Sequence, residues 1–165
     1  MRTYLTHVGA KALVGDRGGM QGVNFDAEGK HLTITDGHAL IEIPCSVDDG
    51  DVSAILPVEA FNAKGIVGRG EQATIAVNGK VEVKGSGGIK TLDQIDGRFP
   101  RTDSVWPAEE PVFEIGIDLS LLTRVAKAIP GRNKHVKLVF RRVDGPIVFE
   151  ATQSDVKGVV MPISI

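Results

Sequence analysis

The sequence predicts an α+β fold made of repeated units, in which antiparallel sheets back short helices. Short segments that alternate apolar and polar residues recur along the chain, and glycine-containing turns separate them. Segments with a helical spacing of apolar residues lie between these groups of strands. The order of strand, helix and three strands occurs twice, and the first part of the chain follows the same plan without a leading strand.

The composition is that of a soluble globular protein. Of 165 residues, 42% are hydrophobic and 24% are charged, and the net charge of −2 gives no overall positive field that would attract nucleic acid. Cys45 is the single cysteine, which excludes an internal disulfide and a cysteine-rich zinc site. The chain shows neither a signal-peptide pattern nor an apolar run long enough to cross a membrane, so we expect a cytoplasmic protein.

The first repeat is predicted to contain a short helix at residues 3–14, although Gly9 weakens it, followed by three strands. The strands are expected at residues 22–26, 31–35 and 39–43. Asp36-Gly37 separates the last two and predicts a hairpin with a type I′ turn, because glycine readily adopts the positive φ that this turn requires.

The second repeat begins with a predicted strand at residues 53–56. Pro57 suits the start of a helix, which we expect at residues 58–65. Three strands follow, at residues 73–77, 81–84 and 89–92. Asn78-Gly79 lies between the first two of these strands and is a strong hairpin signal.

The third repeat begins with an alternating segment, residues 112–117, that predicts a strand. Asp118 or Ser120 is expected to cap a helix that ends near Pro130-Gly131. One face of this helix is apolar and comprises Leu121, Leu122, Val125, Ala126 and Ile129. Three strands are expected at residues 136–140, 147–151 and 156–161. The polar, proline-rich residues 101–111 predict a linker between the second and third repeats.

Three phrases in this order resemble one protein family. They are Thr35-Asp36-Gly37-His38, then Asp96-Gly97-Arg98-Phe99-Pro100 followed by Trp106-Pro107, and the closing Val159-Val160-Met161-Pro162-Ile163. The chain resembles the bacterial DNA polymerase III β sliding clamps, shortened to about one and a half clamp domains. The resemblance implies that residues 1–107 correspond to the middle clamp domain, as two half-units, and residues 108–165 to the last half-domain. The missing parts make the subunit interface in the family, so closure of a ring by the usual contact is not expected.

The resemblance also implies a pocket that binds short peptides of partner proteins, without any catalytic residue, metal or cofactor. Its wall would comprise Met20, Thr35, Gly37, His38 and Leu40, together with Pro107, Val159, Met161, Pro162 and Ile163. Apolar side chains and an adaptable methionine suit a leucine or phenylalanine anchor on the partner. Taken without the other motifs, residues 35–38 would be an ordinary hairpin turn, and Asp36 with His38 lacks the nucleophile or metal cluster expected of an enzyme.

In a clamp, basic residues on the helices face the phosphate backbone of double-stranded DNA without reading its sequence. The candidates for such a role are Lys11, Lys64, Arg69, Arg124, Lys127, Arg132 and Lys134. An ordinary solvated helix surface is the competing interpretation, and several copies of the chain would be needed around one duplex.

The leading hypothesis is therefore a non-enzymatic, sliding-clamp-like processivity factor of DNA replication or repair. It would dock peptide motifs of DNA polymerases or related proteins and encircle DNA as a homo-oligomer, with no membrane partner. A small adaptor or decoy that binds clamp-interacting proteins without forming a ring is the first alternative. An unrelated β-rich interaction module is the second, and an enzyme is the third.

Overall fold

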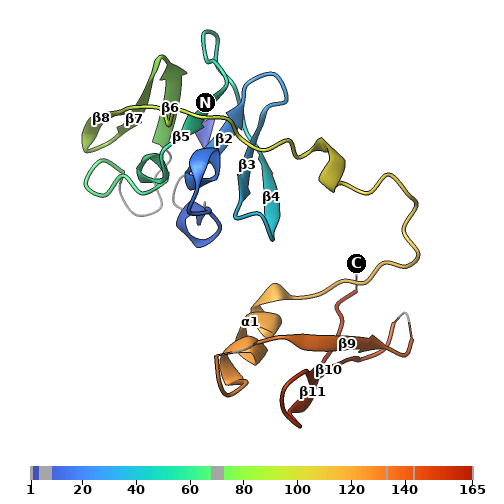
Figure 1. Ribbon diagram of the computed structural model, residues 1–165. Helices are drawn as coiled ribbons and strands as arrows, with labels where there is room; N and C mark the ends of the chain where they lie inside the picture. The colour runs from blue at the N-terminus through green and yellow to red at the C-terminus, as the bar shows by residue number, and fades with distance from the viewer. Residues whose placement is uncertain (1, 4–8, 68–72, 133, 143, 165) are drawn as a thin grey trace. The chain divides into compact units, whose positions relative to one another are not determined.

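A computed structural model describes residues 2–3, 9–67, 73–132, 134–142 and 144–164. The chain forms two compact units, Met1–Trp106 and Pro107–Ile165, called the N-terminal and C-terminal units below. Antiparallel strands make up most of the regular structure in both units (Figure 1). Among the described residues there is one α-helix, α1 (Leu119–Ala128). The predicted α+β class is therefore confirmed.

The N-terminal unit contains two four-stranded sheets, with the strand orders β4-β3-β2-β5 and β1-β6-β7-β8. The first sheet consists of β2 (Val23–Asp26), β3 (His31–Thr35), β4 (Leu40–Pro44) and β5 (Ala54–Leu56). The second consists of β1 (Arg2–Thr3), β6 (Ala73–Asn78), β7 (Lys80–Gly85) and β8 (Gly88–Leu92). The strands predicted from the sequence overlap all of these strands except β1.

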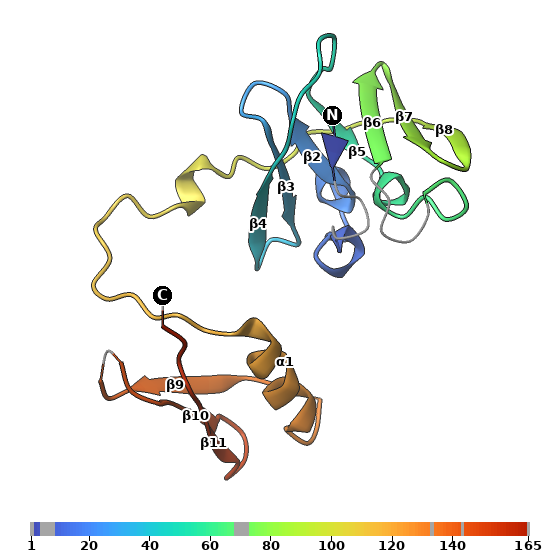
Figure 2. The same ribbon diagram turned by 180° about the vertical axis from the view of Figure 1, so that it is seen from behind.

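The two sheets exchange their leading strands. β5 precedes β6, β7 and β8 in the chain but lies beside β2 (Figure 2). The two strands pair with Leu56 opposite Val23. β1 precedes β2, β3 and β4 but pairs with β6, with Thr3 opposite Ala73. The prediction that the first repeat has no leading strand is therefore wrong. A strand of two residues leaves no periodic pattern, so β1 could not be predicted from its local sequence.

The core of the N-terminal unit takes one face of β2 and of β6, whereas β3 is buried on both faces. Val23 and Phe25 of β2 alternate with less buried neighbours, as do Ile75 and Val77 of β6. Ala60 and Phe61 of the 3₁₀-helix η4 (Val58–Phe61) belong to the same buried cluster. Burial of this apolar surface is the main force that holds the two sheets and η4 in one unit.

The predicted helices of the N-terminal unit are shorter than expected. The segment predicted as a helix at residues 58–65 forms only the single-turn η4, and the backbone leaves helical geometry at Asn62, with a φ of −140°. Of residues 3–14, Thr3 belongs to β1, residues 4–8 lie outside the described residues, and Ala10–Ala12 forms the 3₁₀-helix η2. Helices this short have little intrinsic stability, because forming the first turn fixes several residues for one hydrogen bond.

The C-terminal unit packs α1 against a three-stranded sheet of order β11-β10-β9. Its strands are β9 (Val136–Phe140), β10 (Ile147–Ala151) and β11 (Lys157–Val160). Asp118 caps α1, because its side chain accepts a 2.8 Å hydrogen bond from Ser120 N. Of the two predicted caps, Asp118 and Ser120, the first is therefore confirmed. Leu121, Leu122 and Val125 pack on the core as predicted, whereas Ala126 is exposed, so its assignment to the apolar face is wrong.

Residues 112–117 do not form the strand that their alternation predicts. Only Gly116 makes a β-bridge, to Ile163 near the end of the chain, and Val112 is 97% exposed. A strand needs a neighbour to satisfy its backbone hydrogen bonds, and the described residues of this unit offer this segment no such neighbour.

No helix in the described part of the chain is long and apolar enough to cross a membrane. In the same part of the chain, no group of three or more His, Cys, Asp or Glu side chains is arranged to hold a metal ion. Burial raises the pKa of the Cys45 thiol, which favours its protonated, unreactive form.

Candidate functional site

The turn between β3 and β4 is held by two side chains. Asp36 Oδ1 accepts hydrogen bonds from His38 N at 2.8 Å and Ala39 N at 2.9 Å. Thr35 Oγ1 accepts one from Gly37 N at 3.0 Å and donates one to Ala39 O at 2.7 Å. The hairpin of this loop is therefore braced from within, while His38 and Gly37 face the solvent.

The loop differs from the predicted type I′ turn. Thr35 pairs with Leu40, so the loop comprises the four residues between them. Gly37 has a φ of 89°, but the other described residues of the loop do not have positive φ values, whereas a type I′ turn needs two in succession. The Asp36 carboxylate explains the difference, because it binds the two N–H groups that this longer loop turns inward.

These hydrogen bonds also set the electrostatics of the turn. Donation from Ala39 N, and next from His38 N, lowers the pKa of the Asp36 carboxyl below its ordinary value. Asp36 is thus an ionised structural group whose oxygen is occupied by backbone donors. This arrangement favours the turn over the alternative of an Asp36–His38 acid–base pair.

Met20 lies beside this turn. It belongs to the 3₁₀-helix η3 (Gly18–Gln21), and its carbonyl accepts a 2.8 Å hydrogen bond from Gly15 N. A side-chain carbon placed on Gly37 would lie 4.0 Å from Met20 Sδ. The structure therefore brings together the predicted residues of the N-terminal unit, which we call the hairpin group: Met20, Thr35, Gly37, His38 and Leu40.

The predicted residues of the C-terminal unit form a second set, which we call the tail group: Pro107, Val159, Met161, Pro162 and Ile163. Val159, Met161 and Ile163 are 55%, 58% and 49% exposed, whereas Val160 between them is 5% exposed. This alternation follows from the extended backbone, which sends successive side chains to opposite sides. Pro162 is half-buried and Pro107 is exposed. The end of the chain thus presents an apolar row to solvent.

The basic residues proposed to face DNA are distributed over both units. Lys11 and Lys64 are exposed in the N-terminal unit, and Arg124, Lys127 and Arg132 are exposed in the C-terminal unit. Lys134 Nζ donates a hydrogen bond to Ile129 O and so closes the end of α1. Arg69 lies outside the described residues.

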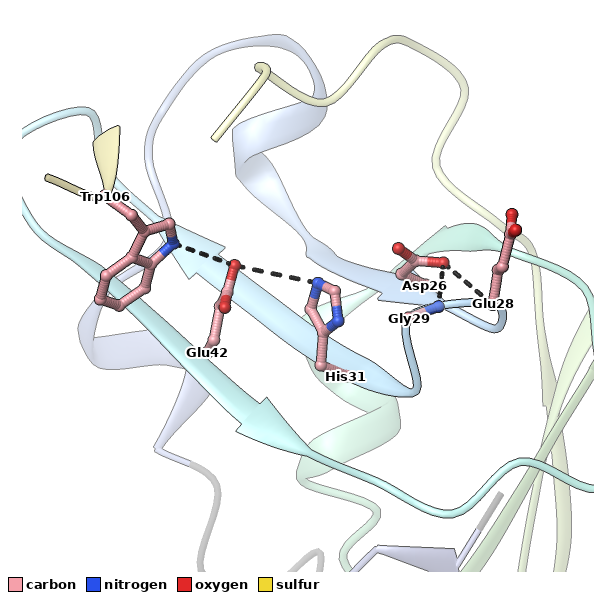
Figure 3. Close-up of polar contacts among 6 residues, drawn as sticks. All are labelled: Asp26, Glu28, Gly29, His31, Glu42 and Trp106. Carbon is pink, nitrogen blue, oxygen red and sulfur yellow. Dashed lines mark hydrogen bonds and ion pairs between the residues drawn. The ribbon is translucent and has the colours of Figure 1, made fainter. Parts of the chain in front are cut away.

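Sequence reasoning missed a polar contact that fixes the end of the N-terminal unit. Trp106 Nε1 donates a 3.4 Å hydrogen bond to Glu42 Oε1, and the same oxygen lies 3.9 Å from His31 Nε2 (Figure 3). His31 and Glu42 lie on the neighbouring strands β3 and β4. No sequence pattern links Trp106 to Glu42, because they are far apart in the chain.

Figure 3 also shows the turn before β3. Asp26 Oδ1 accepts 3.0 Å hydrogen bonds from Glu28 N and Gly29 N. This turn repeats the device of the β3–β4 loop, in which one aspartate binds two backbone N–H groups. Such turns are structural, and the likeness supports a structural role for Asp36 as well.

A second feature not expected from the sequence is a broad, open pocket of about 500 Å³ in the N-terminal unit. It is lined by residues of β2 and β5 and by the segment that contains the Asp96-Gly97-Arg98-Phe99-Pro100 phrase. None of the hairpin group contributes to it. The phrase therefore lines this pocket, whereas the β3–β4 turn does not.

Comparison with known proteins identifies the fold. No protein-family model matches the sequence, and no curated protein matches it. Among solved structures, the DNA polymerase sliding clamp of Pseudomonas aeruginosa matches with a TM-score of 0.71 and 16% identity, over 98% of this chain and 50% of that chain. The Bacillus subtilis sliding clamp gives 0.70 and 21%, over 96% and 47%. The Helicobacter pylori β clamp bound to a DNA ligase peptide gives 0.66 and 17%, over 93% and 45%.

The chain thus spans about half the length of the clamps it matches. At sequence identities of 16%, 21% and 17%, the comparison shows a shared fold and no more. The antiparallel sheets with few helices, described above, are those of the clamp-type α+β architecture. The resemblance seen in the three sequence phrases is confirmed at this level: the chain has the fold of the bacterial DNA polymerase III β sliding clamps, over about half of a clamp chain.

Proposed function

We propose that the protein is a non-enzymatic, sliding-clamp-like accessory factor of DNA replication or repair that docks short peptide motifs of partner proteins. In this proposal residues 1–107 act as a middle clamp domain and residues 108–165 as the last clamp half-domain. The residues proposed to bind the peptide are those of the hairpin group and those of the tail group. DNA polymerases and DNA ligases are the classes of partner that the solved clamp structures suggest.

The observation that carries the proposal is the exposed apolar row of the tail group. Val159, Met161 and Ile163 remain about half exposed or more, although each is large and apolar. Such a row on a folded surface is typical of an interaction site. Met161 adds an unbranched, polarisable side chain that adjusts to different anchor residues. The braced loop of the hairpin group supplies a fixed backbone beside Met20 and Leu40.

A direct binding measurement tests the proposal. A fluorescein-labelled DNA ligase peptide, of the kind bound to the Helicobacter pylori clamp, is titrated with the full chain, and anisotropy is recorded. We expect saturable binding that Met161→Ala weakens by roughly 5- to 30-fold, as loss of a central apolar anchor does. Ile89→Ala is the matched control, because Ile89 is 62% exposed on β8 but lies outside both groups. Equal binding by the wild type and Met161→Ala, or no saturation at all, refutes peptide docking by the tail group.

DNA encirclement is the second part of the proposal, and the exposed basic residues support it. Their number in one chain is small, so contact with the phosphates of one duplex would require several copies. Retention on circular but not on linearised plasmid, with a loading factor supplied, is the expected result. Equal retention of the protein on circular and linearised plasmid would indicate ordinary charge attraction to DNA. Retention on neither form would favour the adaptor or decoy.

A further inference from the structure

The C-terminal unit repeats the local geometry of the second repeat, in which β5 is the leading strand. Ile55 O of β5 accepts a 2.9 Å hydrogen bond from Ile95 N, and Gly116 O accepts a 3.0 Å hydrogen bond from Ile163 N. Both acceptors lie two residues before a helix N-cap, which is Pro57 in one case and Asp118 in the other. Both donors lie three residues after the last strand of their repeat. Residues 115–117 therefore occupy the place of a leading strand.

The two segments differ in what lies on their other side. β5 pairs with β2 of the first repeat, whereas residues 115–117 have no strand there among the described residues. β9, the counterpart of β2 and β6, is an edge strand that pairs only with β10. The C-terminal unit thus contains both parts of the strand exchange seen in the N-terminal unit, a donor segment and an acceptor edge, and the two do not pair with each other in the described part of the unit.

The free backbone groups of both parts can be identified. Thr152 N donates to His135 O, and hydrogen bonding alternates along an antiparallel pair, so Val136 and Leu138 direct their backbone groups to the open edge of β9. The backbone carbonyl of Gly116 points toward Ile163. By the same alternation, the backbone N–H and C=O groups of Ile115 and Ile117 point away from Ile163. Each part therefore offers a row of unpaired donors and acceptors, which makes an edge prone to pairing.

Side-chain exposure agrees with an unfinished core. The rings of Phe113 and Phe140 contact each other, with centroids 5.3 Å apart, but Phe113, Leu138 and Phe140 remain 45%, 42% and 40% exposed. Leu138 and Phe140 stand opposite the buried Phe149 and Ile147 of β10, on the same face of the sheet. The buried cluster of this unit contains Ile129, Phe149 and Val160, far fewer residues than the cluster of the N-terminal unit. The apolar surface next to the open edge is thus left for a further element to cover.

We propose that the C-terminal units of two copies of this chain pair by exchanging these segments. Residues 115–117 of each copy lie antiparallel along β9 of the other. The register of Leu56 opposite Val23 and of Thr3 opposite Ala73 places Ile117 opposite Val136, Gly116 opposite Lys137 and Ile115 opposite Leu138. The interface is self-complementary, as a two-fold axis requires, and it completes two four-stranded sheets like those of the N-terminal unit.

This inference sharpens the homo-oligomer part of the proposed function and leaves peptide docking aside. Its tests measure mass and cross-linking, whereas the peptide titration measures binding to Met161. Failure of either result therefore does not imply failure of the other.

Cross-linking tests the register. In a Cys45→Ser background, Glu114→Cys and Val139→Cys would face each other across a non-hydrogen-bonded pair, where side chains come close enough for a disulfide. We expect oxidation to give a dimer on a non-reducing gel. The matched control, Glu114→Cys with Lys137→Cys, shifts one partner by two residues on the same face and is expected to give much less dimer. A disulfide formed only within one chain, seen as an oxidised monomer by mass spectrometry, overturns the proposal.

Light scattering after size-exclusion chromatography tests the pairing without added cysteines. We expect a dimer for the wild type, and at least about tenfold weaker dimerisation for Ile115→Pro, which removes a backbone N–H from the pairing edge twice per dimer. Residue 115 lies outside the strands and α1, so the fold of the single unit does not depend on this N–H. Glu114→Pro places the same ring on the neighbouring residue, whose N–H points away from β9, and is expected to remain dimeric. A wild type that is monomeric at every concentration reached, or an Ile115→Pro variant as dimeric as the wild type, refutes the exchange.

Discussion

Thr33 and Thr35 lie two residues apart on β3 and are both buried, but only Thr35 has a hydrogen-bonded hydroxyl. Thr35 Oγ1 bonds to Gly37 N and Ala39 O, whereas Thr33 Oγ1 has no partner among the described residues. A threonine hydroxyl is thus expected to stabilise the fold at position 35 and to destabilise it at position 33. An unpaired buried hydroxyl costs free energy, and a paired one braces the β3–β4 loop.

A pair of valine substitutions should separate these contributions. Thr35→Val leaves Gly37 N and Ala39 O without their partner, and we expect it to lower the free energy of unfolding by about 1–3 kcal/mol. Thr33→Val removes a hydroxyl without a partner and should be neutral or stabilising by up to about 1 kcal/mol. Urea titration followed by circular dichroism measures both. Equal destabilisation by the two variants would contradict the assigned hydrogen bonds.

The cap of α1 makes a second prediction. Asp118→Ala removes the acceptor for Ser120 N and should cost about 0.5–2 kcal/mol of stability, because the first turn of a helix has no other partners for its N–H groups. Asp118→Asn keeps an acceptor oxygen and is the matched control, expected to stay within a few tenths of a kcal/mol of the wild type. Thermal unfolding monitored at 222 nm reads the helix directly. A loss as large in Asp118→Asn as in Asp118→Ala would show that charge, not capping geometry, is responsible.

The stability of the protein should fall at acidic pH partly through Asp36 and Asp118. Hydrogen bonds from Ala39 N and His38 N lower the pKa of Asp36, and those from the Ser120 side chain and backbone lower the pKa of Asp118. A carboxyl whose pKa is lower in the folded state stabilises that state fully above its unfolded pKa, here near 3.8. This contribution disappears as the pH falls through the lower folded pKa.

The double variant Asp36→Asn/Asp118→Asn should therefore show a shallower decline of unfolding free energy below about pH 4 than the wild type. Asparagine keeps an acceptor at each position, so the two proteins are compared with similar hydrogen bonding. Urea titrations at a series of pH values give the two curves. Parallel curves through the acidic range would mean that neither carboxyl is linked to folding.

The close approach of η3 to the 96–100 segment provides a fourth prediction. A side-chain carbon on Gly19 would lie 2.7 Å from Arg98 O and 2.9 Å from Ile55 Cδ1. Gly19→Ala should therefore destabilise the N-terminal unit by about 1–3 kcal/mol. Gly9→Ala is the control, because Gly9 has a φ of −75° and no described atom lies within 4 Å of the added carbon. Its stability should be unchanged or slightly higher, and a comparable loss in both variants would exclude crowding at Gly19.

The strands whose pattern is local were the most predictable part of the fold. β3 and β4 follow from the alternation of their own residues and from the Asp36-Gly37 turn between them. β1 was missed and residues 112–117 were assigned wrongly for one reason, since a leading strand depends on a partner from another repeat. Arg2 and Thr3 have that partner in β6, whereas residues 112–117 have none among the described residues.

The candidate site was predictable to a similar extent. The three phrases pointed to the turn and to the tail, and the exposure of Met161 and Ile163 agrees with an interacting surface. The contact of Trp106 with Glu42 was not predictable, because it joins residues that are far apart in the chain and follow no periodic pattern. Met20 lies beside the turn because η3 folds back toward it. The glycine-rich sequence around η3 does not predict this position.

The exchange of β1 and β5 has a consequence for how the chain reaches its native state. β1 lies at the start of the N-terminal unit and its partner β6 follows β5, so the first sheet is incomplete until β5 has been synthesised and the second until β6, β7 and β8 have. Pairings between residues so distant in sequence raise the contact order, which slows folding. On the ribosome, the first three strands would emerge with an exposed edge at β2 and would wait for β5 to cover it. The arrangement that ties the two repeats into one stable body thus also makes them fold as one.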